Sequence, residues 1–189
     1  MTELEKMKSN IPYNALDSEI LELQKQASEL QYKFNMSSSS DERKEIIKKL
    51  FGECGDDISI APGFRCDFGF NIHAKGFILV NYNCVFLDTS AITIGANTLI
   101  GPGTCIVCAG HPIHPEERLV NVCSQPINIG ESVWIGANCT IKGGVTIGNG
   151  SIIGGGSVVT RDIPENVIAV GSPCRVVRKI TENDRLNFK

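Results

Sequence analysis

The sequence has few aromatic residues, little net charge and no long apolar run. Of its 189 residues only 6% are Phe, Trp or Tyr, and the formal net charge at pH 7 is -3. This charge excludes the broad basic surface with which proteins bind nucleic acid. No apolar run reaches the roughly 18 to 20 residues that would span a bilayer, and the opening MTELEKMKSN lacks the apolar core of a signal peptide. We therefore expect a cytoplasmic protein that binds neither nucleic acid nor membrane.

Cysteines at metal-binding spacing are also scarce, although the chain has eight cysteines. Cys105 and Cys108 form the one CxxC sequence, and no second close pair follows to complete the four ligands of a structural zinc site. Because the cytosol keeps thiols reduced, we expect no disulfide framework. Because the second cysteine pair is missing, we expect no bound metal.

The N-terminal part of the chain has the patterns of α-helices. Asp17 is the predicted N-cap of a first helix, and Ser39 and Glu42 form a predicted capping box for a second helix, which Gly52 is expected to end. These helices make up a predicted cap over residues 1–56. The first helix is predicted from apolar residues spaced by three and four: Leu16, Ile20, Leu23, Ala27, Leu30 and Phe34.

A six-residue repeat replaces the helical pattern after the cap. Residues 129–158 read IGESVW IGANCT IKGGVT IGNGSI IGGGSV, where every block opens with Ile and has a small residue at its fifth position. Helices repeat near 3.6 and strands at 2, whereas in a hexapeptide β-helix each block is one short strand and a bend, and three blocks make a triangular coil. The repeat predicts a mainly β fold for residues 57–189: a single-stranded, left-handed parallel β-helix with a C-terminal tail. The opening residues should stack inside it, namely Ile94, Ile100, Ile106, Ile129, Ile135, Ile141, Ile147, Ile153 and Val159.

The largest interruption of the repeat is an extended loop at residues 107–126. Long excursions from a rigid scaffold are a usual place for function. This one contains His111 and His114, two of the three histidines of the chain. Gly110 and Pro112 flank His111 and give its side chain a defined direction. On the residues alone, a catalytic histidine and a solvated one both remain open.

The motifs of the chain carry a family resemblance in their order. The stretch IPYNALDSEILELQKQASELQYKFN is similar to the helical cap of maltose acetyltransferases. FRCDFGFNI, NYNCVFLD, AGHP, VWIG, GGVTIG, SVVTRDIP and GSPCRVVR resemble successive motifs of the maltose and galactoside O-acetyltransferases over nearly the whole chain. The resemblance is closest to the maltose O-acetyltransferases. It implies a homotrimeric, acetyl-CoA-dependent enzyme that needs no metal and moves an acetyl group directly to a hydroxyl of maltose, glucose or a galactoside-like sugar.

The resemblance also implies roles for residues of the acceptor site. His111, in AGHP, matches the catalytic base of the family, and a neutral imidazole can accept the proton of a sugar hydroxyl. Asn81, in NYN, matches an asparagine at the reacting centre, where its amide can stabilise the oxyanion and contact the substrate. Asp67 and Asp88 match positions at or beside contacts to acceptor hydroxyls. For Asp88 a turn role and a competing role for Thr89 remain open.

A further set of residues matches family contacts to CoA. Small residues let the linear pantetheine lie along a coil edge, and arginine suits phosphate through forked hydrogen bonds. A trimer contact for Trp134, and solvated positions for Arg161 and Arg178, stay open as alternatives. The matched residues are Trp134, Ala137, Gly155, Thr160, Arg161, Arg175 and Arg178.

The sequence departs from the family within the loop. After Arg118 it reads LVNVCSQPIN, without the acidic residue that several relatives carry there. The acceptor therefore stays open between a sugar hydroxyl and the amine of an aminosugar. We expect the cap residues Tyr13 and Asn14 to lie near the acceptor pocket.

Two other functional classes also remain open. One is a metal hydratase like the gamma-class carbonic anhydrases, with His73, His111 and His114 at poor spacing, and the other is a non-catalytic trimeric β-helix module.

Overall fold

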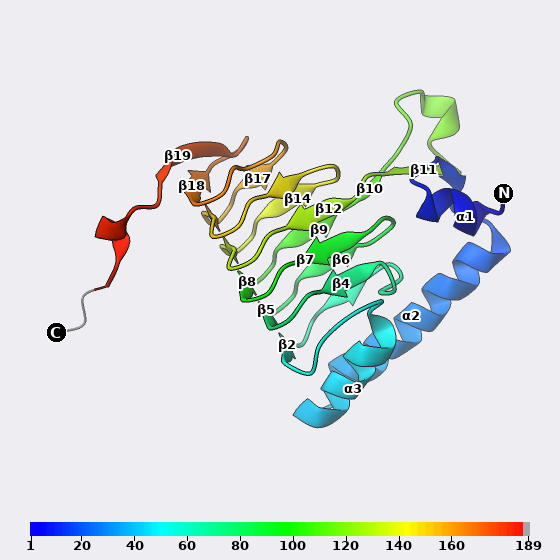
Figure 1. The fold of residues 1–189 in the computed structure, drawn as a ribbon. Coiled ribbons are helices and arrows are strands. Elements are labelled where there is room, and N and C mark those ends of the chain that lie inside the picture. The colour runs from blue at the N-terminus through cyan, green and yellow to red at the C-terminus, as the bar shows by residue number, and fades with distance from the viewer. Residues whose placement is uncertain (187–189) are drawn as a thin grey trace.

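The computed structural model describes residues 1–186, which form a β-helix with α-helices packed along one of its sides (Figure 1). Residues 187–189, the last of the predicted C-terminal tail, lie outside the described residues. No helix of the described part is long and apolar enough to cross a membrane. The helices are α1 (Glu3–Lys8), α2 (Ser18–Met36), α3 (Ser40–Leu50) and the short 3-10 helices η1 (Pro115–Glu117) and η2 (Glu182–Asp184).

Three sheets form the sides of a triangular prism, and the chain visits them in a fixed order. The seven-stranded sheet contains β2 (Ile58–Ile60), β5 (Ile78–Val80), β8 (Thr98–Ile100), β13 (Trp134–Ile135), β16 (Ile152–Ile153), β18 (Val167–Val170) and β19 (Arg175–Lys179). The five-stranded sheet contains β3 (Arg65–Cys66), β6 (Val85–Leu87), β9 (Cys105–Val107), β14 (Thr140–Lys142) and β17 (Val158–Val159). The four-stranded sheet contains β4 (Ile72–Ala74), β7 (Ile92–Ile94), β12 (Ile127–Ile129) and β15 (Thr146–Ile147). Within these three sheets the pairing is parallel except for β18 with β19. The predicted left-handed parallel β-helix is confirmed.

The interior of the prism consists of the two residue columns that the repeat predicts. The opening residues of the blocks, from Ile94 to Val159, are at most 2% exposed. The small residues at the fifth positions are also buried, and the polar ones hydrogen-bond to the backbone: the Thr98 hydroxyl donates to the Gly130 carbonyl at 2.9 Å. Stacked coils thus bury a continuous aliphatic core without leaving polar groups unpaired.

The helical cap follows its predicted signals with three exceptions. Asp17 does cap α2, because its carboxylate accepts the Glu19 N–H at 3.0 Å. The predicted capping box of α3 is only half formed. The Ser39 hydroxyl accepts the Glu42 N–H at 3.3 Å, but the Glu42 carboxylate bonds the Ser37 hydroxyl at 2.6 Å instead of the Ser39 N–H. Leu16 precedes the helix and is 57% exposed, so it is not part of the buried stripe.

Gly52 does not end α3 in the predicted way. The helix stops at Leu50, with Phe51 as its C-cap in an extended conformation. A Cβ atom on Gly52 would lie 2.0 Å from the Phe70 carbonyl oxygen. Glycine is therefore required there by close packing of the cap on the first coil and not by a left-handed turn.

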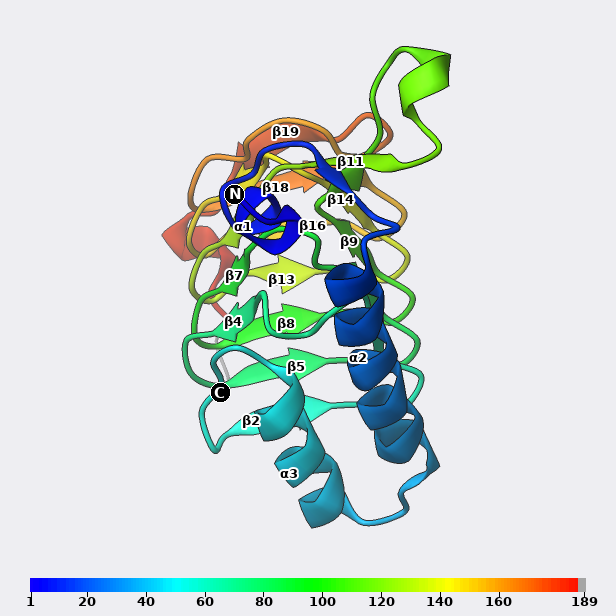
Figure 2. The ribbon, with the colours of Figure 1, turned by 90° about the vertical axis from the view of Figure 1, so that its right-hand side faces the viewer.

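The cap is fastened to the corner where the five-stranded sheet leads into the four-stranded sheet, which we call the five–four corner. This corner faces the viewer in Figure 2, with β4 and β7 on its left, β9 and β14 on its right, and α1 and α2 in front. The Gln31 side chain of α2 donates to the Cys66 carbonyl at 3.0 Å and accepts the Cys66 N–H at 2.8 Å.

The predicted loop at residues 107–126 is an arm with secondary structure of its own. β10 (Ala109–Gly110) and β11 (Asn121–Ser124) form a hairpin around η1, and β1 (Tyr13–Asn14) of the cap pairs antiparallel with β11. A second small core joins arm, cap and prism through Met7, Tyr13, Ile20, Phe68 and Val122. The arm is therefore held by the N-terminal segment and not only by the prism.

Candidate functional site

The five–four corner brings together the residues predicted for catalysis and for acceptor binding, with the exception of Asn81. Asp67 follows β3, Asp88 follows β6 in the next coil, and the arm that carries His111 leaves after β9 in the third. Thr160 and Arg161 follow β17 at the same corner, further along the prism. Because parallel coils stack in register, side chains far apart in sequence share this edge.

His111 has a defined tautomer in this structure. Its Nδ1 atom lies 3.0 Å from the backbone oxygen of Asn121. A carbonyl oxygen only accepts, so Nδ1 carries the proton and Nε2 of the neutral ring is an unprotonated acceptor. Asn121 is itself aligned with Asn14 across the β1–β11 pair, so the cap strand supports the carbonyl that orients the imidazole. A side chain in this state can remove a proton from a hydroxyl.

The exposed His111 side chain lines a groove between the arm and the cap. The walls combine apolar surface with hydroxyl, amide and one ammonium group. A groove of this composition suits a small molecule with several hydroxyls. Besides His111, the lining includes Asn10, Pro12, Cys108, Ala109, Gly110, Ile113, Cys123, Ser124, Gln125, Pro126, Lys142 and Gly143.

Asp88 is buried beneath this region and is bonded to the backbone. Its Oδ1 accepts the N–H groups of Asp67 at 3.0 Å and Phe68 at 2.9 Å, and the side chain is 0% exposed. The Asn71 side-chain amide donates to the backbone carbonyl of Asp88 at 2.7 Å. We call this set of hydrogen bonds around Asp88 the clasp. Burial raises the pKa of Asp88 to about 6, against the lowering effect of the Phe68 N–H. A side chain without exposed surface cannot touch an acceptor, so in this structure Asp88 positions the segment that carries Asp67.

Thr89, the predicted alternative to Asp88, is also buried. Its hydroxyl accepts a hydrogen bond from the Ser124 hydroxyl at 2.8 Å. Ser124 lines the His111 groove, so Thr89 supports the groove from behind.

Asp67 stands at the end of this clasp with a free carboxylate. Its carboxylate oxygens make no hydrogen bond or ion pair with any part of residues 1–186. Burial raises the pKa of Asp67 to about 6. Tyr13 packs close by, and its own pKa is raised by burial and by the negative charges of Asp67 and Asp88. The Asp67 carboxylate is therefore available to a ligand at this corner.

Asn81 lies at a different corner, where the seven-stranded sheet leads into the five-stranded sheet, which we call the seven–five corner. It follows β5, and its Oδ1 accepts the Tyr82 N–H at 2.8 Å, which leaves its amide N–H groups as donors. Ala137 and Gly155 follow β13 and β16 at this same corner and lie on successive coils, since the Gly156 N–H donates to the Ala137 carbonyl at 2.8 Å. One chain therefore does not bring Asn81 and His111 together.

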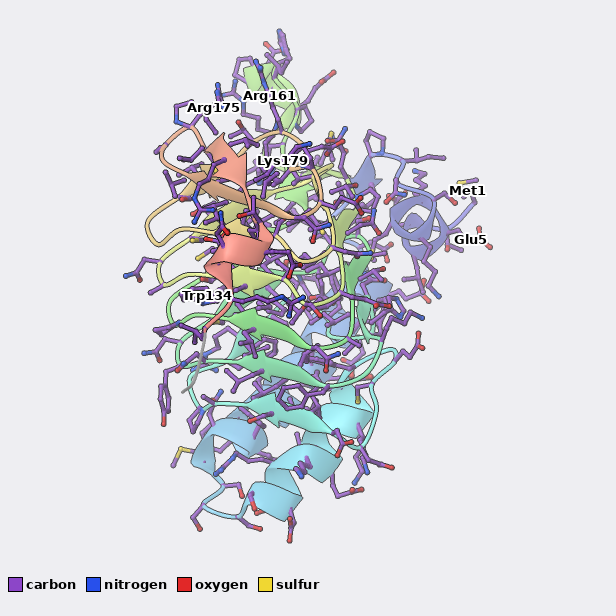
Figure 3. The ribbon with its side chains drawn as sticks, turned by 60° about the vertical axis from the view of Figure 1, so that its left-hand side comes forward. Met1, Glu5, Trp134, Arg161, Arg175 and Lys179 are labelled. Atoms are coloured by element: carbon purple, nitrogen blue, oxygen red, sulfur yellow. The ribbon has the colours of Figure 1, made fainter. Side chains whose placement is uncertain are left out.

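Trp134 lies on the outer face of the seven-stranded sheet and is 53% exposed. It is aligned with Leu99 in the preceding coil and with Ile152 in the following one. Figure 3 shows it on the side of the prism away from Met1 and Glu5. The outward row of this sheet begins with Ser59 on β2 and is then apolar through Leu79, Leu99, Trp134, Ile152 and Ile168.

The three predicted cofactor arginines differ in their surroundings. Arg161 and Arg175 are exposed, and within residues 1–186 Arg175 Nη1 donates only to the neighbouring Cys174 carbonyl, at 2.7 Å. Arg178 is already paired: its two terminal nitrogens donate to the Asp184 carboxylate at 2.8 and 2.7 Å. A phosphate can use the planar fork of Arg178 only when Asp184 releases it.

The three histidines do not form one site within the chain. His73 lies on β4 with its Nδ1 atom 3.9 Å from the Glu53 carboxylate, whereas His111 and His114 belong to the arm. Among residues 1–186 no group of three or more His, Cys, Asp or Glu side chains is arranged to hold a metal ion. The donor geometry of one chain thus gives no support to the metal hydratase hypothesis.

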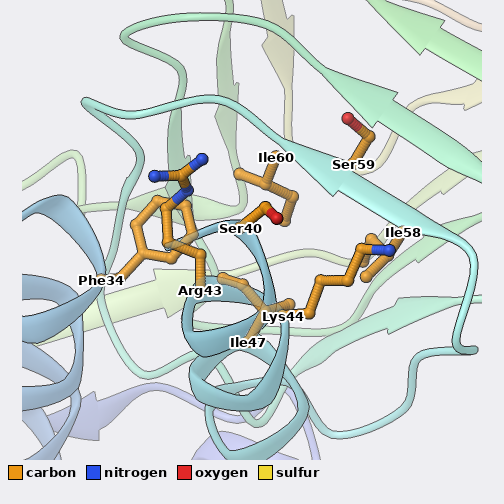
Figure 4. A pocket seen from close by; sticks show the side chains of 8 residues that line it. All are labelled: Phe34, Ser40, Arg43, Lys44, Ile47, Ile58, Ser59 and Ile60. Atoms are coloured by element: carbon orange, nitrogen blue, oxygen red, sulfur yellow. The ribbon is translucent and has the colours of Figure 1, made fainter. Parts of the chain in front are cut away.

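A separate depression lies between α3 and β2 (Figure 4). Its apolar floor is formed by Phe34, Ile47, Ile58 and Ile60, and Ser40, Arg43, Lys44 and Ser59 stand around it. It contains no general base, so we do not assign the reaction to it.

Two features of the site were not predicted from the sequence. The Asn121 carbonyl has no sequence signal, because every residue has a backbone oxygen. The hydrogen bonds of Asp88 with Asp67 and Phe68 did have a sequence signal. These residues are separated by about one coil of the repeat, so they must lie on neighbouring coils.

Comparisons with known proteins match both the helical cap and the repeat region of this chain. Residues 6–55 match the maltose acetyltransferase hexapeptide capping motif, and residues 126–161 match the bacterial transferase hexapeptide of six repeats. A galactoside O-acetyltransferase of Escherichia coli is 38% identical over 82% of this chain and 78% of its own length. The crystal structure of a maltose O-acetyltransferase from Clostridium difficile superposes with a TM-score of 0.94 at 42% identity, covering 96% of this chain and 99% of that one. A hexapeptide-repeat acetyltransferase of Vibrio cholerae, solved with acetyl-CoA, superposes with a TM-score of 0.90 at 37% identity, covering 96% of this chain and 100% of that one.

Proposed function

Because the chain belongs to the maltose and galactoside O-acetyltransferase family of hexapeptide-repeat proteins, we propose that it acetylates a sugar hydroxyl with His111 as general base. The chain is an acetyltransferase, and acetyl-CoA is its co-substrate. The observation that carries the proposal is the Nδ1 contact of His111 with the Asn121 carbonyl, which leaves Nε2 free to accept a proton.

The reaction is a direct transfer. Nε2 of His111 takes the proton of the acceptor hydroxyl while its oxygen attacks the thioester carbonyl carbon. The carbon–sulfur bond then breaks, the acetyl ester remains on the sugar, and the imidazolium returns its proton to the CoA thiolate. The free amide N–H groups of Asn81 are placed to stabilise the oxyanion formed in between, provided that a second chain brings them to the His111 groove.

A cyclic homotrimer would unite the two corners. Two observations support it. The outward row of the seven-stranded sheet is apolar from Leu79 to Ile168, whereas the four-stranded sheet has a polar outward row made of His73, Thr93, Asn128 and Thr146. A heterologous contact repeated around a threefold axis lets the seven–five corner of one chain meet the five–four corner of the next. Sedimentation at micromolar concentration should give a trimer, and a monomer there would contradict this arrangement.

The same arrangement gives CoA a place between two chains. Ala137 and Gly155 lack bulk at the seven–five corner, and Trp134 lies on the sheet beside it. Thr160 and Arg161 come from the five–four corner, and Arg175 from β19. We propose that these residues bind the pantetheine and phosphates, with Arg178 joining them once Asp184 has released it.

The test is a comparison of two histidine variants. His111→Ala should lower turnover by at least about 10²-fold, with the dissociation constant of CoA nearly unchanged, because a general base acts in the transition state. His114→Ala is the matched control, since it removes an imidazole from the same arm. Thiol release from acetyl-CoA with a panel of neutral sugars and amines measures the effect. Equal loss in the two variants would refute the assignment of a single base.

A further inference from the structure

One block of the six-residue repeat has a lysine where most other blocks have glycine. In the block that opens with Ile141, Lys142 occupies the second position. Ile141 is buried in the prism, whereas Lys142 ends β14 and is exposed. The aliphatic core therefore does not need this side chain, and its charge is free for another task. The glycines at the equivalent positions are Gly95, Gly101, Gly130, Gly136, Gly148 and Gly154.

The backbone after Lys142 packs directly against the base of the arm. Lys142 is aligned with Val107 on β9, where the arm leaves the prism beside β14 (Figure 2). A Cβ atom on Gly143 would lie 2.9 Å from the Cys108 carbonyl oxygen and 3.2 Å from that of Gln125. Cys108 lies at the start of the arm and Gln125 at its return to the prism. This close approach fixes the backbone of Lys142 between the two ends of the arm.

The Lys142 ammonium lines the same groove as His111 and has no carboxylate partner within residues 1–186. Among the described residues that line the groove none is Asp or Glu, and neither Asp67 nor Asp88 belongs to the lining. The positive charge of the groove is therefore not balanced by its own walls. Lysines elsewhere in the described chain do form ion pairs, namely Lys6, Lys25, Lys48 and Lys75.

Neutral hydrogen-bond donors accompany the ammonium in the groove. Asn10 Oδ1 accepts the Ser90 hydroxyl at 2.6 Å, which leaves the amide N–H groups of Asn10 as donors. The Gln125 side chain is exposed and makes no hydrogen bond within residues 1–186, so its amide N–H groups are also available. An ammonium with amide donors around it suits an anionic oxygen group, because charge-assisted hydrogen bonds are the strong ones.

We propose that the acceptor is an acidic sugar whose anionic group, a carboxylate or a phosphate, binds Lys142 while one of its hydroxyls faces His111. The proposal rests on the proposed function and specifies its substrate. Lys142 is a specificity-determining residue in this arrangement, and Gln125 assists it from the neighbouring wall of the groove.

The anionic group takes no part in the transfer itself. His111 takes the proton of the hydroxyl, the hydroxyl oxygen attacks the thioester carbonyl carbon, and the carbon–sulfur bond breaks. The products are the O-acetyl ester, which keeps its anionic group, and CoA, whose thiolate recovers the proton. Because the anion is bound equally in the ground state and in the transition state, Lys142 should act mainly on KM.

The test compares glucuronate and glucose 6-phosphate with glucose, which lacks the anionic group. In the wild type we expect kcat/KM for at least one acidic sugar to exceed that for glucose by at least about 10-fold, mainly through KM. A preference for glucuronate alone would assign the groove to carboxylates, and one for glucose 6-phosphate alone would assign it to phosphates. The preference should decline as ionic strength rises, because salt screens an exposed charge.

Three variants locate the origin of the preference. Lys142→Met removes the charge at similar length and should abolish most of the preference, whereas Lys142→Arg keeps the charge and should retain most of it. Lys49→Met, which removes an exposed lysine of α3, is the matched control for net charge and should leave the preference intact. In the absence of acetyl-CoA, the preferred acidic sugar should raise the melting temperature of the wild type more than glucose does, and Lys142→Met should lose that difference.

The cofactor provides the necessary comparison, because Thr160 and Arg161 follow β17 one coil further along the same corner. The dissociation constant of CoA should stay nearly unchanged in Lys142→Met. Weaker CoA binding without a change of acceptor preference would place Lys142 in the cofactor site and refute the inference. Equal kcat/KM for acidic and neutral sugars, or a preference that survives Lys142→Met, would also refute it while leaving O-acetylation of neutral sugars possible. Failure of every sugar, with CoA binding intact, would instead refute the proposed function together with it.

Discussion

Replacing Asp67 by Asn is expected to stabilise the protein at neutral and alkaline pH. Burial raises the pKa of Asp67 from 3.8 to about 6, which means that the folded state disfavours the ionised carboxylate. A shift of this size corresponds to about 3 kcal/mol between the two protonation states. The asparagine variant has the same shape and no charge, so it avoids this loss.

The direction of the pH dependence follows from linkage. With the pKa raised on folding, the contribution of Asp67 is most favourable below pH 3.8, where the carboxyl is protonated in both states, and it is lost as pH rises through about 6. We therefore expect Asp67→Asn to exceed the wild type in free energy of unfolding by about 1 to 3 kcal/mol at pH 8. Near pH 4 the difference should almost disappear.

Urea unfolding at pH 4, 6 and 8, at one fixed protein concentration, measures this difference. Asp56→Asn is the contrasting control, because Lys48 lowers the pKa of Asp56 at the surface and removal of that carboxylate should not stabilise the fold. An Asp67→Asn variant no more stable than the wild type at pH 8, or equally stabilised at pH 4, would refute the reasoning. A stabilising substitution that also raises the KM of the acceptor would identify Asp67 as a residue kept for function.

Three other substitutions test the clasp, the cap and the cofactor site. Asp88→Ala should lower the free energy of unfolding by about 2 to 4 kcal/mol and raise the acceptor KM, because two backbone N–H groups lose their acceptor. Asp88→Asn keeps an acceptor oxygen and should restore most of both quantities. Equal effects of the two substitutions would contradict the clasp. Gly52→Ala should cost about 1 to 3 kcal/mol in chemical unfolding, because its Cβ would meet a backbone oxygen, while Gly55→Ala, with open space around it, should be neutral. Asp184→Asn should tighten CoA binding in calorimetry by freeing Arg178, with no gain for CoA that lacks its 3′-phosphate; weaker binding would show that Arg178 serves only the tail.

The prism was predictable from the sequence because its cause is periodic. A buried Ile at every sixth position, as at Ile135 and Ile141, fits only a coil in which those residues stack. The helices of the cap were predicted in the same way from spacing and from the Asp17 cap. Features without a period were missed or misread, such as the close packing at Gly52 and the short strands β10 and β11.

The candidate site was predictable only residue by residue. The AGHP motif indicated His111, but the tautomer of its imidazole depends on the backbone carbonyl of Asn121, which the sequence does not identify. Asp67 and Asp88 were both assigned to acceptor hydroxyls, whereas their unequal burial gives them separate tasks. The division of Asn81 and His111 between two corners follows from which sheet each residue leaves, and the motifs alone do not contain that information.

The central claim is that an acetyltransferase site forms where His111 of one chain meets Asn81 of the next, and mixing two inactive variants tests it most directly. Asn81→Ala and His111→Ala should each lose at least about 10²-fold in turnover, since one removes an oxyanion donor and the other the base. When the two are unfolded, mixed in equal amounts and refolded as trimers, about a quarter of the sites should contain both native residues and activity should return to a similar fraction of the wild type. Mixed trimers, identified by native mass spectrometry, that remain as inactive as the parent variants would contradict the claim.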